Sequence, residues 1–243
     1  MKVTSHLRKT ANNISPRAWF ISLLVCLVVV VAGAVILNEY KVAQQHAETD
    51  DEWSLIARPI TLEDHTIGTI GAPVQLIVYS DFECTYCKAL FKTDIPKLQA
   101  QFPNQLVVAY RHRVLVSDPS SKIEEEASEC VAQAGGNDAF WKFAESMFDQ
   151  SSSVDKKDST VLAAFATQAG ADPQTYAACM KAGAGAPEVD KDNLEASIAG
   201  ITQDPSILLK SAHRALIVSG EYYSQLYTGI TYLLETNSQI NGR

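Results

Sequence analysis

A buried-strand pattern that runs directly into two cysteines constrains the fold of this chain more than any other feature. Residues 74–80 are an apolar, β-branched run short enough to be a buried strand. Cys84 and Cys87 follow at once, and apolar residues then recur at helical spacing from 89 to 102. Residues 106–112 form a second buried-strand pattern. A strand, a helix and a strand within about forty residues predict a parallel βαβ unit.

The rest of the chain adds a helical block and a second group of strands. Pro96 is expected to kink or restart the first helix near Thr93 and Asp94. Residues 206–210 and 214–219 predict a hairpin, and 221–235 predict a closing helix. Between these parts, Ala-, Glu- and Lys-rich segments have helical periods near 121–134, 138–149, 158–169, 174–182 and 187–199. The expected order is therefore βαβ, a helical insertion, and ββα, an α/β fold.

An uncharged apolar segment, residues 19–37, is nearly long enough to span a bilayer. Residues 1–18 carry Lys and Arg and no acidic residue, whereas acidic residues predominate just after the segment. Because basic flanks stay on the cytoplasmic side, we expect 1–18 to be a cytoplasmic tail, 19–37 a transmembrane helix in the inner membrane and 38–55 a linker. A cleaved signal peptide is the alternative, because residues 32–34 are Ala-Gly-Ala. Either way the cysteine pair is exported, where disulfides persist.

Length and charge limit the class of protein. A chain of 243 residues suits one globular unit plus a targeting segment, and 47% hydrophobic residues are enough for a core. The net charge of -8 argues against nucleic-acid binding, which needs a basic face to displace counterions from phosphates. We therefore expect no nucleic-acid partner.

The spacing of Cys84 and Cys87 allows a disulfide across one helical turn. A helix N-terminus offers unpaired N–H groups and a positive dipole end, both of which stabilise a thiolate. We therefore predict that Cys84 is the exposed nucleophile and that Cys87, one turn deeper, resolves the mixed disulfide. Thr85 and Tyr86 are expected to tune the potential. Glu83 is expected either to shuttle protons or merely to be exposed.

A lone Cys-x-x-Cys is also half of a zinc site. That interpretation needs a second cysteine pair or a histidine pair with ligand spacing, and His65, His112 and His213 are scattered in the sequence. We accordingly predict no metal and no cofactor. An inert buried disulfide is the other alternative, and it is disfavoured because a strand-to-helix junction exposes the first cysteine.

The residues Ser80-Asp81-Phe82-Glu83-Cys84-Thr85-Tyr86-Cys87 at a strand end resemble the active-site entry of the DsbA-like branch of the thioredoxin superfamily. The resemblance covers roughly residues 60–235. It implies a mixed sheet of four or five strands with helices on both faces and a helical domain capping the active site. We therefore expect a thioredoxin-like domain from 56–120 and 201–243, with 121–200 as the inserted helical domain.

The same resemblance assigns Pro205 as a cis-proline against the cysteine pair, with the residue before it pairing with substrate as an added strand. Here that residue is Asp204, where the family usually has Thr or Val. A carboxylate near Cys84 would oppose the thiolate unless it points to solvent. The alternative is that Asp204-Pro205 is an ordinary turn.

Three further features fall in the helical block. Cys130 and Cys179 are expected to form a structural disulfide in an oxidising compartment, the alternative being two buried thiols. The charged segment 122–129 is interpreted as a solvated helix face. The remaining prediction is a core between this block and the sheet, formed by Phe140, Trp141, Phe143, Met147 and Phe148.

The resulting functional hypothesis is an exported dithiol oxidase that donates the Cys84–Cys87 disulfide to reduced secreted proteins and is reoxidised by a membrane partner. A disulfide reductase or isomerase on the same fold is the first alternative, since Asp204 and the lack of a proline after Cys84 depart from the resembled family. A membrane-anchored binding module without turnover is another. A carrier that binds metal through the thiolates is a third.

Overall fold

The computed structural model describes residues 25–34, 37, 57–114, 121–149, 155, 157–203, 205–212, 214–218 and 222–241. The chain divides into two units, Met1–Thr49 and Asp50–Arg243. In the first unit, residues 25–34 are helical. The second unit contains both cysteine pairs and all of the strands that the structure describes.

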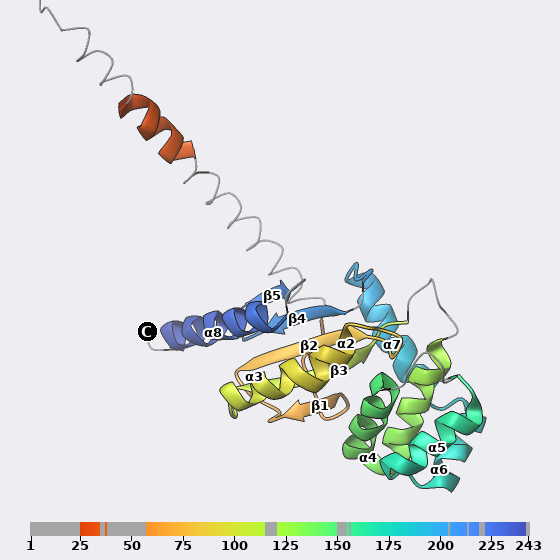
Figure 1. The fold of residues 1–243 in the computed structure, drawn as a ribbon. Coiled ribbons are helices and arrows are strands. Elements are labelled where there is room, and N and C mark those ends of the chain that lie inside the picture. Colours follow the sequence, from red (N-terminus) through yellow and green to blue (C-terminus); the bar gives the residue numbers. More distant parts are fainter. Residues whose placement is uncertain are drawn as a thin grey trace, which may run out of the picture. The chain divides into compact units, whose positions relative to one another are not determined.

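The element order of the second unit follows the expected plan, with one additional strand at its start (Figure 1). The first part is β1 (His65–Gly68), β2 (Val74–Ser80), α2 (Cys87–Ala89), the π-helical turn η1 (Leu90–Asp94), α3 (Ile95–Gln101) and β3 (Leu106–His112). The helical block is α4 (Lys122–Asp149), α5 (Ser159–Ala169), α6 (Pro173–Ala182) and α7 (Ala186–Ile198). The last part is β4 (Ser206–Lys210), β5 (Ala215–Val218) and α8 (Tyr222–Asn241).

The strands form one mixed sheet in the order β1-β3-β2-β4-β5. Only β2 and β3 are parallel, joined by the helical crossover α2-η1-α3, so the predicted βαβ unit is confirmed. The other three pairs are antiparallel, and β4 and β5 form the predicted hairpin. Strand β1 was not expected, and its four residues extend the sheet beyond β3.

The alternation of side chains along β2 and β3 sends two sets of apolar residues to opposite faces of the sheet. Leu76 and Val78 belong to the larger core, which also includes residues of α3, α4 and α8. Ile77 and Tyr79 belong to a smaller core with Ala196 of α7. Both faces are therefore covered by helices, as the resemblance implies.

Proline and glycine interrupt the helices where the sequence predicts. The π-helical turn η1 ends at Asp94, and α3 begins at Ile95 with Pro96 in its first turn. Because proline has no N–H to bond the preceding turn, the helix changes its hydrogen bonding there. Gly136 has φ 78° and breaks the helical geometry inside α4. This break lies between the two helices predicted for 121–134 and 138–149.

The predicted membrane-spanning segment falls largely outside the described residues, because 19–24, 35 and 36 are not described. Within the part of the chain that the structure describes, no helix is both long and apolar enough to cross a membrane. The tail 1–18 and the linker 38–55 also lie outside it.

Candidate active site

Cys84 and Cys87 form a disulfide in the turn between β2 and α2, with Cα atoms 5.4 Å apart. Cys84 is half-buried and Cys87 is fully buried. The backbone N–H of Cys87, the first residue of α2, donates a hydrogen bond to the Cys84 Sγ atom at 3.2 Å. The outer sulfur is therefore reachable from solvent and already faces a helix N-terminal N–H that would stabilise it as a thiolate.

The inner sulfur has a different environment. The side chain of Ser80, the last residue of β2, is completely buried, and its hydroxyl lies 2.8 Å from the Cys87 Sγ atom. This hydroxyl can donate a hydrogen bond to the negative charge that develops on the Cys87 sulfur when the disulfide opens. Sequence reasoning did not single out Ser80, although its position seven residues before Cys87 at the strand end follows from the strand boundary.

Phe82 anchors the turn that carries Cys84 to the hydrophobic core. Its ring is buried and lies against the rings of Tyr110, Phe143 and Phe148. Its backbone N–H donates to the Oε1 atom of Glu125 at 2.8 Å. The side chain of Asp81 accepts from the N–H of Glu83 at 2.9 Å, which closes the turn. The predicted core between helical block and sheet thus reaches the active-site turn.

The residues predicted to tune the pair lie on the surface around it. Glu83, Thr85 and Tyr86 are all exposed, and 69% of the surface of Tyr86 is accessible to solvent. An aromatic ring so exposed beside a reactive sulfur is available to a bound partner.

Pro205 immediately precedes β4, and its neighbour Ser206 pairs with Tyr79 of β2. The register therefore places Pro205 at the same end of the sheet as Ser80 and the cysteine turn. Pro205 is buried and lines a cavity of about 180 Å³ together with Thr202, Gln203 and Ile217. Asp204, the residue expected to face substrate, lies outside the described residues, as does His213.

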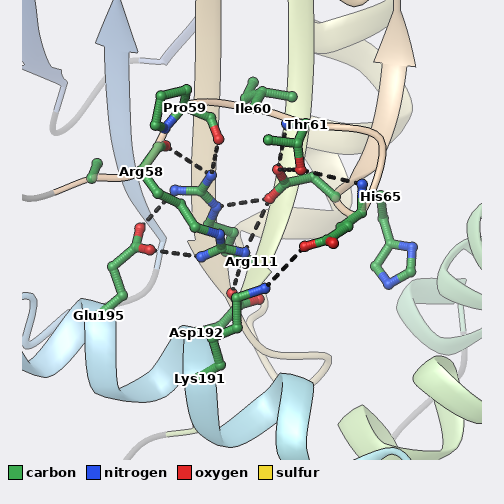
Figure 2. Close-up of polar contacts among 12 residues, drawn as sticks. Arg58, Pro59, Ile60, Thr61, His65, Arg111, Lys191, Asp192 and Glu195 are labelled. Atoms are coloured by element: carbon green, nitrogen blue, oxygen red, sulfur yellow. Dashed lines mark hydrogen bonds and ion pairs between the residues drawn. The ribbon is translucent and has the colours of Figure 1, made fainter.

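The face of the sheet that α7 covers carries a buried ionic network, which joins α7 to the strands (Figure 2). Arg111 of β3 is fully buried and donates to Asp64 at 2.9 Å and to Glu195 of α7 at 2.6 Å. Arg58 contacts the same two carboxylates and Asp192. Although burial acts in the other direction, the bonds from Arg111 lower the pKa of Asp64.

This network means that α7, the last helix of the predicted insertion, packs on the sheet. Asp149, at the end of α4, pairs with Lys88 of α2 at 3.1 Å and also with Lys92 of η1. Cys130 of α4 and Cys179 of α6 form a disulfide with Cα atoms 5.5 Å apart. The helical block is thus attached to the sheet through α7 and to the α2-η1 crossover through α4, and a disulfide links α4 to α6.

One interpretation from the sequence is wrong. The segment 122–129 is not a solvated face, because Glu124 and Glu125 are completely buried, and Glu129 is largely so. Glu125 and Glu129, spaced by four residues, lie on the same side of α4 and contact His112.

Two of the histidines that are scattered in the sequence, His65 and His112, are also brought together. His65 of β1 and His112 of β3 both contact Glu129. Burial disfavours the charged ring, yet the hydrogen bonds with Glu125 and Glu129 raise the pKa of His112 well above its ordinary value. The sequence did contain one signal of this cluster, because the i,i+4 spacing of Glu125 and Glu129 places both carboxylates on one face of a helix. The sequence did not reveal β1, and without this strand His65 could not be placed beside β3. In the structure, the register of β1 sets His65 opposite Tyr110 of β3.

A protein-family model described as thioredoxin matches residues 61–222, which includes the cysteine turn, the helical block and both strands of the final hairpin. The chain belongs to the thioredoxin family. The Cys84–Cys87 disulfide lies at the strand-to-helix junction, inside the residues that the family model matches.

Solved structures of the family show the same fold. BdbD from Bacillus subtilis in its oxidised form is 22% identical, with a TM-score of 0.61 over 74% of this chain and 97% of that one. DsbA from Chlamydia trachomatis is 16% identical, with a TM-score of 0.62 over 75% and 96%. BcfH from Salmonella enterica Typhimurium is 13% identical, with a TM-score of 0.64 over 88% and 92%. The DsbA-like thioredoxin fold with a helical insertion is thereby confirmed.

The curated proteins that match this chain in sequence are named as Na(+)/H(+) antiporters. The Na(+)/H(+) antiporter NhaA 1 of Mycolicibacterium vanbaalenii is 30% identical over 123 residues, 50% of this chain and 19% of that protein. The Na(+)/H(+) antiporter NhaA of Herminiimonas arsenicoxydans is 27% identical over 194 residues, 79% of this chain and 29% of that protein. The match spans less than a third of the length of either relative.

Proposed function

We propose that this chain is a thiol-disulfide oxidoreductase, and specifically a dithiol oxidase that acts outside the cytoplasm and introduces disulfides into exported proteins through Cys84 and Cys87. Residues 19–37 would hold it in the inner membrane as a single-pass anchor with the N-terminus in the cytoplasm. Reduced or misfolded exported proteins would be its substrates, and a membrane redox protein would reoxidise it.

The proposed reaction has two exchange steps. A thiolate of the substrate attacks the Cys84 Sγ atom, a mixed disulfide forms, and Cys87 leaves as a thiolate. A second substrate thiolate then attacks the substrate sulfur of the mixed disulfide, and Cys84 leaves as a thiolate. Two electrons pass from the substrate to the protein, and the substrate keeps the new disulfide.

The observation that carries this proposal is the contrast between the two sulfurs. Cys84 is half-buried with its sulfur facing the Cys87 N–H, whereas Cys87 is fully buried beside the Ser80 hydroxyl. Both contacts favour the charged, reduced sulfurs over the disulfide. A reduced state stabilised in this way makes the disulfide a stronger oxidant.

A disulfide reductase or isomerase is the second candidate function, and particular residues favour it. Thr85 and Tyr86 stand between the cysteines without a proline, and Asp204 precedes Pro205. A carboxylate near the outer sulfur would weaken its thiolate and make the disulfide less oxidising.

Trapping of mixed disulfides tests the proposed function in cells. A Cys87→Ser variant of the full chain lacks the resolving sulfur, so Cys84 should accumulate covalent complexes with exported proteins that contain cysteine. A Cys84→Ser variant is the matched control and should trap none. Identification of the attached proteins by mass spectrometry gives the substrates.

Two outcomes would count against the proposal. Complexes dominated by cytoplasmic proteins would contradict the exported location. A cellular role that survives Cys84→Ser unchanged would indicate a membrane-anchored binding module in place of an enzyme.

A further inference from the structure

Three side chains that could bind a metal converge at one point within the fold. The Nε2 atom of His65 lies 2.7 Å from the Oε1 atom of Glu129, and the Nε2 atom of His112 lies 2.5 Å from that same oxygen. All three ligand atoms lie within 4.8 Å of one another. They come from β1, β3 and α4, so the fold and not the sequence spacing assembles them.

The contacts of the ring nitrogens show why the arrangement suits a cation. The Nδ1 atom of His112 lies 2.5 Å from the Oε2 atom of Glu125, and its Nε2 atom faces Glu129. The Nε2 atom of His65 faces the same oxygen of Glu129. Two ring nitrogens and one carboxylate oxygen thus face a common point inside the protein, where a single cation could bind all three.

The groups around the three side chains resemble the surroundings of known metal ligands. A histidine that binds a metal through Nε2 almost always donates its Nδ1–H to a carboxylate or carbonyl oxygen, which fixes the ring. Glu125 stands in that position toward His112 and is itself held by the N–H of Phe82 at 2.8 Å. The ring of His65 is stacked on Phe140 with centroids 3.6 Å apart. Both rings are thus fixed before any ion arrives.

The cluster is also accessible from outside. A cavity of about 330 Å³ is lined by Glu63, Asp64, His65, Glu129 and Asn137, so it reaches two of the three side chains. Its lining is mostly polar, and it gives both a path for an ion and room for water as a further ligand. The side chain of Glu63 at its margin is 80% exposed and would draw cations toward the site.

From this geometry we propose that His65, His112 and Glu129 form a binding site for a divalent transition metal of the zinc class, with Glu125 orienting His112 and a water molecule completing the coordination. Two imidazoles and one carboxylate suit zinc and its neighbours, whereas calcium and magnesium prefer oxygen ligands. With metal bonds of about 2.0–2.1 Å, tetrahedral ligand atoms stand roughly 3.3 Å apart. Glu129 therefore needs to withdraw by less than about 1 Å from its present contacts.

The proposed site shares no residue with the cysteine pair, but one side chain connects the two regions. It uses no thiolate, and as a proposal it differs from the expectation from sequence that the chain has no metal site. Glu125 connects the two regions, because it contacts His112 with one oxygen and the active-site turn at Phe82 with the other. The inference stands whether or not the chain is an oxidase.

Metal titration of the oxidised protein tests the site without interference from the cysteines. The full chain is prepared without a histidine tag and with Cys26→Ser, so that both disulfides are closed and no thiol is left. Calorimetric titration with Zn²⁺ should show one tight equivalent. Titration with Co²⁺ should give the visible absorption of a four- or five-coordinate ion. Absence of a stoichiometric Zn²⁺ equivalent in this protein overturns the proposal, and that result needs no further variant.

Variants then locate the site. Glu129→Gln and His65→Gln should each remove the tight equivalent and the cobalt spectrum, while Glu125→Gln should weaken binding by roughly 10- to 100-fold. Glu126→Gln changes the next residue of α4, whose carboxylate pairs with Lys122, and should bind as the parent does. Tight binding that survives both Glu129→Gln and His65→Gln would place the ion elsewhere, for example on His6, His46 or His213, and would also overturn the proposal.

Discussion

The hydroxyl of Ser80 lies 2.8 Å from the Sγ atom of Cys87, and both side chains are completely shielded from solvent. Cys87 is the sulfur that leaves when a substrate attacks Cys84, so this hydroxyl faces the atom on which negative charge develops. A hydrogen bond to a charged group contributes about 1.5–3 kcal/mol.

Replacement of Ser80 by Ala should therefore slow the opening of the disulfide. Reaction of the oxidised protein with a small dithiol, followed by stopped-flow fluorescence, should be at least about tenfold slower, because each 1.4 kcal/mol lost from the departing thiolate is a factor of ten. Ser128→Ala removes an equally buried hydroxyl from α4 and serves as the control for loss of packing. Equal rates in Ser80→Ala and the parent would show that the contact has no part in the reaction.

Loss of the second disulfide should affect stability and leave the chemistry intact. Cys130 and Cys179 close a loop with a sequence separation of 49 residues. In the chain-entropy model such a bridge stabilises the fold by about 4 kcal/mol. The double replacement by Ala should lower the free energy of unfolding in urea by up to that amount. The rate of dithiol reaction at Cys84 should stay within about twofold of the parent, and a large drop in that rate would mean that the helical block shapes the active site more directly.

The buried Arg111 should be far less replaceable than Arg58, although the two share partners. Arg111→Met leaves Asp64 and Glu195 without their fully buried cation, a change that costs about 3–5 kcal/mol when one partner of a buried pair is removed. The side chain of Arg58 keeps 24% of its exposure, so Arg58→Met should cost less. Urea unfolding of the two variants measures the order. A smaller loss for Arg111→Met would show that solvent reaches the network.

Two helix N-caps predict a pH dependence of stability. Asp158 accepts hydrogen bonds from the N–H groups of Thr160 and Val161, and Asp172 accepts from Thr175, so the pKa of each carboxyl is lowered below its usual 3.8. A depressed pKa stabilises the fold above the unfolded value and loses that effect as the pH falls through the folded value.

The double variant Asp158→Ala and Asp172→Ala should accordingly melt below the parent at pH 7, and the difference should shrink as the pH falls below about 4. Thermal melts followed by circular dichroism between pH 7 and pH 3 measure it. The corresponding Asn variants keep an acceptor and should lie between the two. A gap between the Ala variant and the parent that is unchanged at pH 3 would argue against capping by the ionised groups.

Much of the fold could be predicted because its signals are local. The runs at 74–80 and 106–112 are apolar in most positions, and both are strands with those bounds. The breaks at Gly136 and before Pro96 follow from the backbone of these two residues alone. Strand β1, in contrast, has only the sequence His-Thr-Ile-Gly, which is too short and too polar for any period to be visible.

What could not be predicted depends on partners distant in the sequence. Arg111 and His112 end a buried strand, and their charges are accommodated only because Asp64, Glu195, Glu125 and Glu129 arrive from three other segments. Glu125 appears in the sequence as one of several acidic residues on a helix. Its burial is decided by the position of α4 against the sheet, which no local pattern specifies.

The reduction potential of the Cys84–Cys87 pair distinguishes an oxidase from a reductase. Equilibration of the purified protein with glutathione buffers of known ratio, with the two states separated by alkylation and mass, yields this potential. An oxidase of the kind proposed here should have a potential near that of strongly oxidising relatives, about -120 to -180 mV. A value near about -270 mV, typical of cytosolic thioredoxin, would contradict the account and assign the chain to disulfide reduction.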